Sequence, residues 1–198
     1  MGFYKDVGIL SFSSLIAALI SFFSYIIISR YYSVDDFGTF QVFISLANYF
    51  ILVSCCKYDT AILLDNSKDE KKYISIICIT LILLTTFLST IFSYFFYIFG
   101  FLATLGKNIF YIPLITFFGG LVVLITSINT TNRKFKLIGI SKISQNTLLS
   151  SSQIYMGIVE ALNYIGLIFG DLVGKFISLY EIGYYMIFDN YLLVIKQL

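Results

Sequence analysis

The sequence predicts an all-α fold, a polytopic membrane helix bundle of about six transmembrane helices. Of its 198 residues, 59% are hydrophobic and only 12% are charged, about half the charged share that is usual in soluble domains. The apolar residues gather into runs close to the roughly 20 residues that a helix needs to cross about 30 Å of hydrocarbon. Runs this continuous also exclude the alternating strands of a membrane barrel. The runs are 9–29, 40–56, 73–99, 109–128, 140–158 and 165–180.

The basic residues give these runs an orientation. When the ends of the runs are numbered alternately inside and outside, starting inside, 11 of the 13 Lys and Arg residues fall on the inner side, and Arg30 and Lys107 fall on the outer side. This bias is typical of a protein with its inner loops in the cytoplasm. We therefore expect a multi-pass protein of the bacterial cell (inner) membrane, with a cytoplasmic N-terminus.

The first half of the chain supplies three of the predicted helices. The first run is longer than the core of a cleavable signal, so we expect a retained helix. An external loop is expected at 30–38 with Asp35 and Asp36, and the second run carries Asn48. Residues 57–72 are highly charged and predict a solvated cytoplasmic turn. The third run exceeds the minimum span, so its helix is expected to tilt or project.

The fourth predicted helix follows an external turn at 100–108. Pro113 lies in its first turns, where a proline removes few helical hydrogen bonds. Gly119 and Gly120 mark a site where this helix can bend. The connector 129–136 is basic and is assigned to the cytoplasm.

The fifth run is the least apolar of the six. A helix this polar cannot face lipid all round, so we expect it to line the bundle interior or a watery cavity. The alternative is an amphipathic helix that lies on the membrane surface. The candidate cavity-lining residues are Gln145, Asn146 and Gln153, together with Asn48 of the second run.

The sixth run carries glycines at four-residue spacing, which places them on one helix face. They are Gly166, Gly170 and Gly174. Small residues at this spacing let two membrane helices approach closely, so we interpret them as a packing seam.

Asp171 is the ionisable residue with the most unusual position. It lies eight residues after Asn163, so about 12 Å below the outer interface at 1.5 Å per residue. One interpretation is a proton or cation site coupled to transport. The other is local neutralisation by Lys175, one turn further along the same face.

The remaining chemistry of the sequence does not indicate an enzyme. Histidine is absent and no P-loop occurs, so the usual triads and this route of nucleotide hydrolysis are missing. The three cysteines match no metal motif. We therefore expect no cofactor, no metal and no nucleic-acid partner. Arg30 and Lys57, which end the first two runs, are either headgroup contacts or interfacial anchors that snorkel.

Three stretches together resemble the polysaccharide-biosynthesis and O-antigen flippase (Wzx-type) family of the multidrug/oligosaccharidyl-lipid/polysaccharide exporter superfamily. The first follows the family pattern Arg-x-x-Ser/Thr-Pro-x-x-Phe-Gly-x-Phe, with Val34 where the family often has proline. It consists of Arg30, Tyr32, Ser33, Phe37, Gly38 and Phe40. The second is Lys57-Tyr58-Asp59-Thr60-Ala61-Ile62. The third is Asn132-Arg133-Lys134-Phe135-Lys136, followed by the polar fifth run and by Gly166-Leu167-Ile168-Phe169-Gly170.

The resemblance implies a fold of two lobes, each of about six helices. It also implies movement of undecaprenyl-diphosphate-linked oligosaccharide to the outer leaflet by alternating access. Its partners would be the lipid-linked oligosaccharide, membrane lipid, a polysaccharide polymerase and glycosyltransferases. The match covers about residues 1–178, so we expect 1–180 to form the N-terminal lobe and 181–198 a short tail. With the second lobe missing, little activity is expected from this chain alone.

Two other classes of function stay open. One is an exporter of amphiphilic or cationic small molecules, from the multidrug branch of the same superfamily. The other is a membrane assembly protein that transports nothing. Neighbouring genes for glycosyltransferases and a polymerase would favour the flippase over both.

Overall fold

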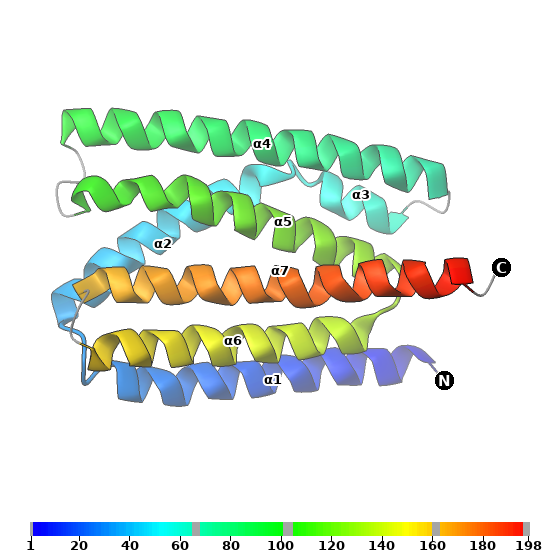
Figure 1. Cartoon of the computed structure of the whole chain (residues 1–198), viewed down its shortest axis with the longest axis horizontal. Coiled ribbons are helices and arrows are strands. Elements are labelled where there is room, and N and C mark those ends of the chain that lie inside the picture. Colours follow the sequence, from blue (N-terminus) through cyan, green and yellow to red (C-terminus); the bar gives the residue numbers. More distant parts are fainter. Residues whose placement is uncertain (1, 65–67, 101–104, 160–162, 196–198) are drawn as a thin grey trace.

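The computed structural model describes residues 2–64, 68–100, 105–159 and 163–195, and within these ranges it is all-helical, without strands (Figure 1). The elements are α1 (Gly2–Ile28), α2 (Val34–Ser54), α3 (Tyr58–Leu64), α4 (Lys68–Phe99), the 3-10 helix η1 (Gly106–Phe110), α5 (Tyr111–Thr131), α6 (Phe135–Ile158) and α7 (Asn163–Ile195). The all-α prediction is therefore confirmed.

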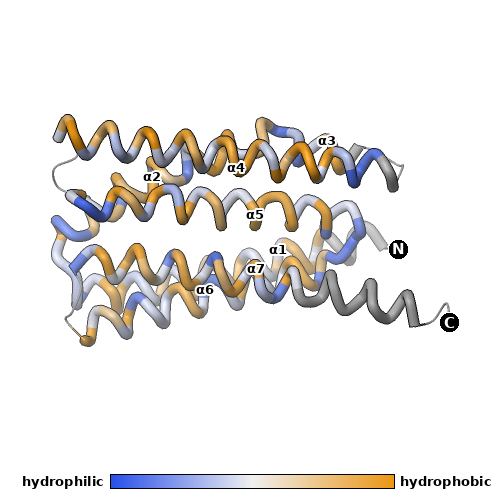
Figure 2. Tube along the Cα trace, turned by 45° about the horizontal axis from the view of Figure 1, so that its top comes forward, coloured by the Kyte–Doolittle hydropathy of each residue, from blue (hydrophilic) through white to orange (hydrophobic). Residues whose placement is uncertain are grey.

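Four segments are long and apolar enough to cross a membrane: Val7–Ile28, Val34–Ser54, Glu70–Phe99 and Gly106–Thr131. They correspond to the first four of the six predicted crossings. The fifth and sixth predicted crossings correspond to α6 and α7, which are not among the four. In Figure 2, polar residues are interspersed along α6 and along the coloured part of α7, whereas α4 and α5 are apolar over most of their length.

The long helices lie side by side in two groups. In Figure 1, α1, α6 and α7 form one group, α4 and α5 form the other with α3, and α2 crosses obliquely behind them. Helix α6 packs against both α1 and α7, while α5 contacts α2, α4 and α7. One buried core joins these groups, and includes Phe43 and Ala47 of α2, Ile112 and Ile115 of α5, and Leu167 of α7.

The predicted external loop at 30–38 is too long. Helix α2 begins at Val34, because Ser33 and Asp36 form a capping box. The backbone N–H of Asp36 donates to Ser33 Oγ, and that of Ser33 donates to Asp36 Oδ2, each at 3.1 Å. This reciprocal pair satisfies two of the donors that a helix start leaves unpaired. Asp35 and Asp36 therefore belong to the first turn of α2.

The predicted solvated turn at 57–72 is also wrong. Its first half is the helix α3, and α4 already begins at Lys68. The side chain of Ile62 is only 1% exposed and packs in a second core with Cys55, Cys78 and Leu124. The cause is the short apolar run that follows Asp59, which gains more from burial on α4 and α5 than from solvation.

Helix α5 is continuous, and α7 extends beyond the predicted end of the sixth run. Pro113 is the third residue of α5, as predicted, and Gly119 and Gly120 lie within this continuous helix. These two glycines make room for Ile51 and Ser54 of α2 and for Ile82 of α4. Residues 181–195, assigned to a tail, continue α7.

Candidate functional site

The polar side chains of α6 are directed at its two neighbouring helices. Toward α1, Ser21 Oγ donates to Asn146 Oδ1 at 2.8 Å. Toward α7, Ser141 and Ser178 share a hydrogen bond of 2.9 Å. Helix α6 runs alongside its neighbours (Figure 1).

Two further contacts tie α6 to α7 near opposite ends of this seam. Ser144 Oγ donates to Glu181 Oε1 at 2.6 Å. The buried Gln153 side chain donates from Nε2 to the Leu167 carbonyl at 3.0 Å. These bonds pair much of the polar surface of α6 with other helices, which is what a helix of this composition needs in lipid, although Gln153 Oε1 and Glu181 Oε2 stay buried without a hydrogen-bond partner among the described residues.

The three glycines of α7 form the other side of the seam. A Cβ at Gly170 would overlap the Gln153 side chain and lie 3.0 Å from the Leu149 carbonyl oxygen. At Gly174 it would lie 3.2 Å from the Gln145 carbonyl oxygen. Gly166 faces the Tyr32 ring. The missing side chains therefore let α7 approach α6 closely, and they bring Gln145 and Gln153 against α7.

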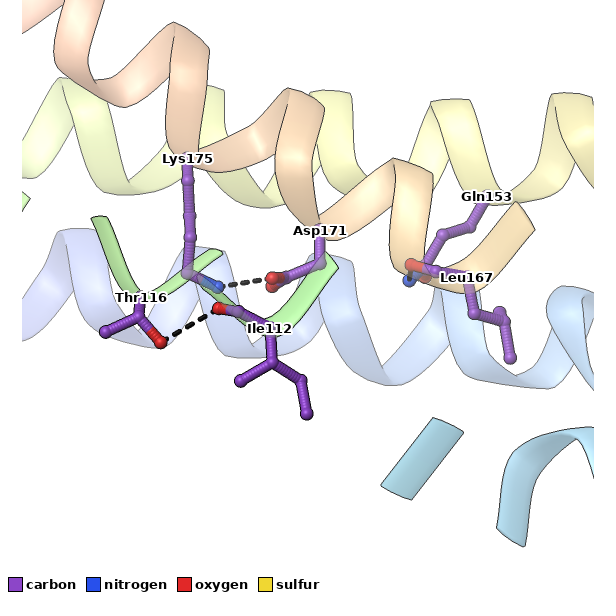
Figure 3. Close-up of polar contacts among 6 residues, drawn as sticks. All are labelled: Ile112, Thr116, Gln153, Leu167, Asp171 and Lys175. Carbon is purple, nitrogen blue, oxygen red and sulfur yellow. Dashed lines mark hydrogen bonds and ion pairs between the residues drawn. The ribbon is translucent and has the colours of Figure 1, made fainter. Parts of the chain in front are cut away.

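Asp171 forms an ion pair with Lys175, one turn away on α7 (Figure 3). Both residues are buried, with 7% and 9% of their surface exposed. In Figure 3 the pair points toward the segment of α5 that carries Ile112 and Thr116. This is the arrangement expected from local neutralisation. A role of Asp171 in ion coupling stays a hypothesis.

A polar corner holds the α1–α2 turn against the start of α7. The Tyr32 hydroxyl donates to the Gln153 carbonyl at 3.0 Å, and the backbone N–H of Tyr164 donates to Asp36 Oδ1 at 3.0 Å. Burial, followed by the nearby Asp36 carboxylate, raises the pKa of Tyr32, so its hydroxyl keeps the proton that it donates. The corner thus fixes helices that are more than a hundred residues apart in the chain.

Two residues of this corner were missed as site residues from the sequence. Asp36 could have been found from its spacing to Ser33, because a serine followed three residues later by an acidic residue is a helix-start signature. Tyr164, whose hydroxyl also donates to the Leu105 carbonyl at 3.1 Å, gave no such signal.

Asn48 and Lys57 form a second group, away from α6. They line a cavity of about 250 Å³ between α2, α3 and α5, together with Ile51, Leu52, Cys55, Asp59 and Val123. Lys57 has left-handed backbone (φ 65°) in the turn between α2 and α3. Arg30, the other predicted headgroup contact, is exposed in the α1–α2 turn and joins neither group.

Comparison with known proteins gave no matching family model, no matching curated protein and no matching solved structure. The described residues hold no cluster of three or more His, Cys, Asp or Glu side chains that could bind a metal ion.

Proposed function

We propose that this chain is a membrane-embedded lobe of a flippase for undecaprenyl-diphosphate-linked oligosaccharide, which serves the synthesis of O-antigen, capsule or exopolysaccharide. One observation carries the proposal: two of the segments with flippase-like sequence meet at the polar corner. Tyr32, in the first segment, packs against Gly166, in the last. A short motif is weak evidence by itself, but two motifs whose residues contact each other in the fold support the same family resemblance together.

The proposal includes six crossings of the bacterial inner membrane, with α6 and α7 as the fifth and sixth. The hydrogen bonds between these two helices support it, because polar groups that bond to each other need not face lipid. We expect reporter tags at the N-terminus and after Leu198 both to be cytoplasmic. A periplasmic tag after Leu198 would mean an odd number of crossings and would overturn this topology.

The function is tested by deleting the gene in its own host. We expect lipid-linked oligosaccharide to accumulate on the cytoplasmic leaflet while surface polysaccharide is lost. Gly166→Leu, which places a bulky side chain against Tyr32, should reproduce this loss. Its matched control is Gly183→Leu in the same helix, since a Cβ at Gly183 meets nothing within 4 Å.

Normal surface polysaccharide in the deletion strain would refute the flippase. A gain in sensitivity to cationic amphiphiles in that strain would instead favour the multidrug-type exporter.

A further inference from the structure

Helix α2 ends halfway along its neighbour α5. Its last residue, Ser54, is fully buried, and a Cβ at Gly120 of α5 would lie 3.1 Å from Ser54 Oγ. Gly120 is near the middle of α5 (Tyr111–Thr131), about 15 Å from either end at 1.5 Å per residue. The end of α2 therefore lies opposite the middle of α5, which is a candidate membrane span, although α2 itself is also long enough to cross a membrane.

Helix α3 continues along α5 beyond the end of α2. Thr131, the last residue of α5, donates from Oγ1 to the Ile62 carbonyl at 3.3 Å. Helices α2 and α3 together therefore reach the inner end of α5, and the turn between them interrupts their course along it. In this turn Cys56 and Lys57 have left-handed backbone, with φ 45° and 65°. Irregular backbone at membrane depth is tolerated where it is buried in protein or lines a hydrated cavity.

The interruption places two opposite charges beside the 250 Å³ cavity. Lys57 and Asp59 both line it, with the Asn48 amide. Within the described part of the chain, neither charged side chain makes a hydrogen bond or an ion pair. An ionisable residue at membrane depth marks a functional site by default, and the gap in a broken helix is a recurrent place for one.

A stripe of polar side chains leads along α2 to this cavity. Gln41, Ser45 and Asn48 are spaced by four and three residues, so they share one helix face, and all three are exposed. They lie within the candidate span Val34–Ser54. Leaving such groups without hydrogen-bond partners in hydrocarbon is costly, so the stripe needs a polar occupant.

We propose that the interruption binds the zwitterionic headgroup of phosphatidylethanolamine and that the stripe guides this headgroup between the leaflets. The ammonium of Lys57 receives the phosphate, and the carboxylate of Asp59 receives the ethanolamine ammonium. The exposed Leu52 lies beside these charges at the cavity wall, where it contacts the apolar part of the lipid. A headgroup with only negative charge would meet repulsion from Asp59. This activity is separate from the transport of lipid-linked oligosaccharide.

The test reconstitutes the full chain in vesicles of phosphatidylcholine and phosphatidylglycerol that contain a trace of phosphatidylethanolamine with a fluorescent acyl chain. Dithionite added outside destroys the fluorescence of the outer leaflet. With the protein present, we expect the signal to fall below the half that is retained in protein-free vesicles. Acyl-labelled phosphatidylglycerol should cross several times more slowly.

Three variants sharpen the test. Lys57→Gln removes a charged hydrogen-bond donor and should slow phosphatidylethanolamine about tenfold, whereas Lys57→Arg should retain most of the rate. Asp59→Asn should abolish the preference over phosphatidylglycerol. The matched control is Arg133→Gln, since Arg133 is also an exposed cation with left-handed backbone (φ 56°); this change should have no effect.

Three results would each overturn the proposal. They are equal signals with and without protein, equal rates for Lys57→Gln and Arg133→Gln, and equal rates for the two lipids with the wild-type chain. None of them bears on the flippase, because surface polysaccharide does not enter the measurement. Helical circular dichroism of each variant before reconstitution separates a lost site from a lost fold.

Discussion

Removing one member of the buried Asp171–Lys175 pair should destabilise the protein more than removing both. The two side chains are only 10% and 11% exposed. A charge left without its partner at such a site costs about 3–5 kcal/mol, whereas replacing both charges by apolar residues of similar size is often neutral or stabilising. Asp171→Asn is therefore expected to lower the free energy of unfolding by about 3–5 kcal/mol, and Asp171→Leu with Lys175→Met by less than about 1 kcal/mol.

The measurement is reversible unfolding in mixed micelles, followed by circular dichroism as the mole fraction of dodecyl sulfate rises. The matched control is Lys142→Met, since Lys142 is exposed and its ammonium donates to Ser14 Oγ at 3.3 Å. Loss of such a surface contact should cost less than about 1 kcal/mol.

Equal stability of Asp171→Asn and the control would refute the reasoning, because it would mean that water reaches the pair. The same variant separates the two interpretations of Asp171. Transport at the wild-type rate by the Asp171→Asn protein would exclude ion coupling through this carboxyl group, whatever the change in stability.

Three more predictions concern packing, capping and access. Gly170→Ala should lower the free energy of unfolding by about 1–3 kcal/mol through overpacking. Its control is Gly183→Ala in the same helix, which meets open space and should raise the free energy of unfolding by up to about 1 kcal/mol through helix propensity. Equal free energies of unfolding for the two variants would argue against the packing seam. Ser33→Ala should cost about 0.5–2 kcal/mol by removing the cap of α2, measured by the same unfolding assay; no loss would mean that water replaces the cap. Cys56 is the exposed cysteine beside the interruption and should react with a water-soluble methanethiosulfonate in native membranes. Mass spectrometry of the intact chain measures this reaction, and no reaction would mean that lipid covers the turn.

The helices were predictable because membrane helices are specified by length and apolar composition, both of which are read directly from sequence. The third and fourth predicted runs, 73–99 and 109–128, end within a few residues of the last residues of α4 and α5, Phe99 and Thr131. The errors concern short polar stretches, where capping and tertiary packing decide. Ser33 and Asp36 were assigned to a loop, although a serine followed three residues later by an acidic residue is a helix-start signature. Ile62 looked like part of a charged connector because its burial depends on α4 and α5, which follow it in the chain.

The candidate site was predictable in part. The polar composition of the fifth run indicates that its side chains need hydrogen-bond partners, but it does not indicate whether these partners are water molecules or other helices. In the structure, several of these side chains form hydrogen bonds to other helices. Asn146 accepts from Ser21 of α1, and Gln153 donates to the Leu167 carbonyl of α7. The interruption after α2 was hidden for another reason. Its depth depends on the alignment of Ser54 with Gly120, which is a contact between segments 66 residues apart in the sequence.

This difference between α6 and α2 bears on where a polar headgroup could cross. On α6, Ser144, Asn146 and Gln153 bond to neighbouring helices, so a passing headgroup would have to break those bonds. On α2, the polar stripe is exposed, and it leads to Lys57 and Asp59, whose side chains make no hydrogen bond or ion pair with any residue that the structure describes. Binding there replaces no existing bond, and it satisfies groups that are costly to leave unpaired in hydrocarbon. For a lipid whose acyl chains stay in the bilayer, the face of α2 that carries Gln41, Ser45 and Asn48 is therefore a better path for the headgroup than the seam along α6.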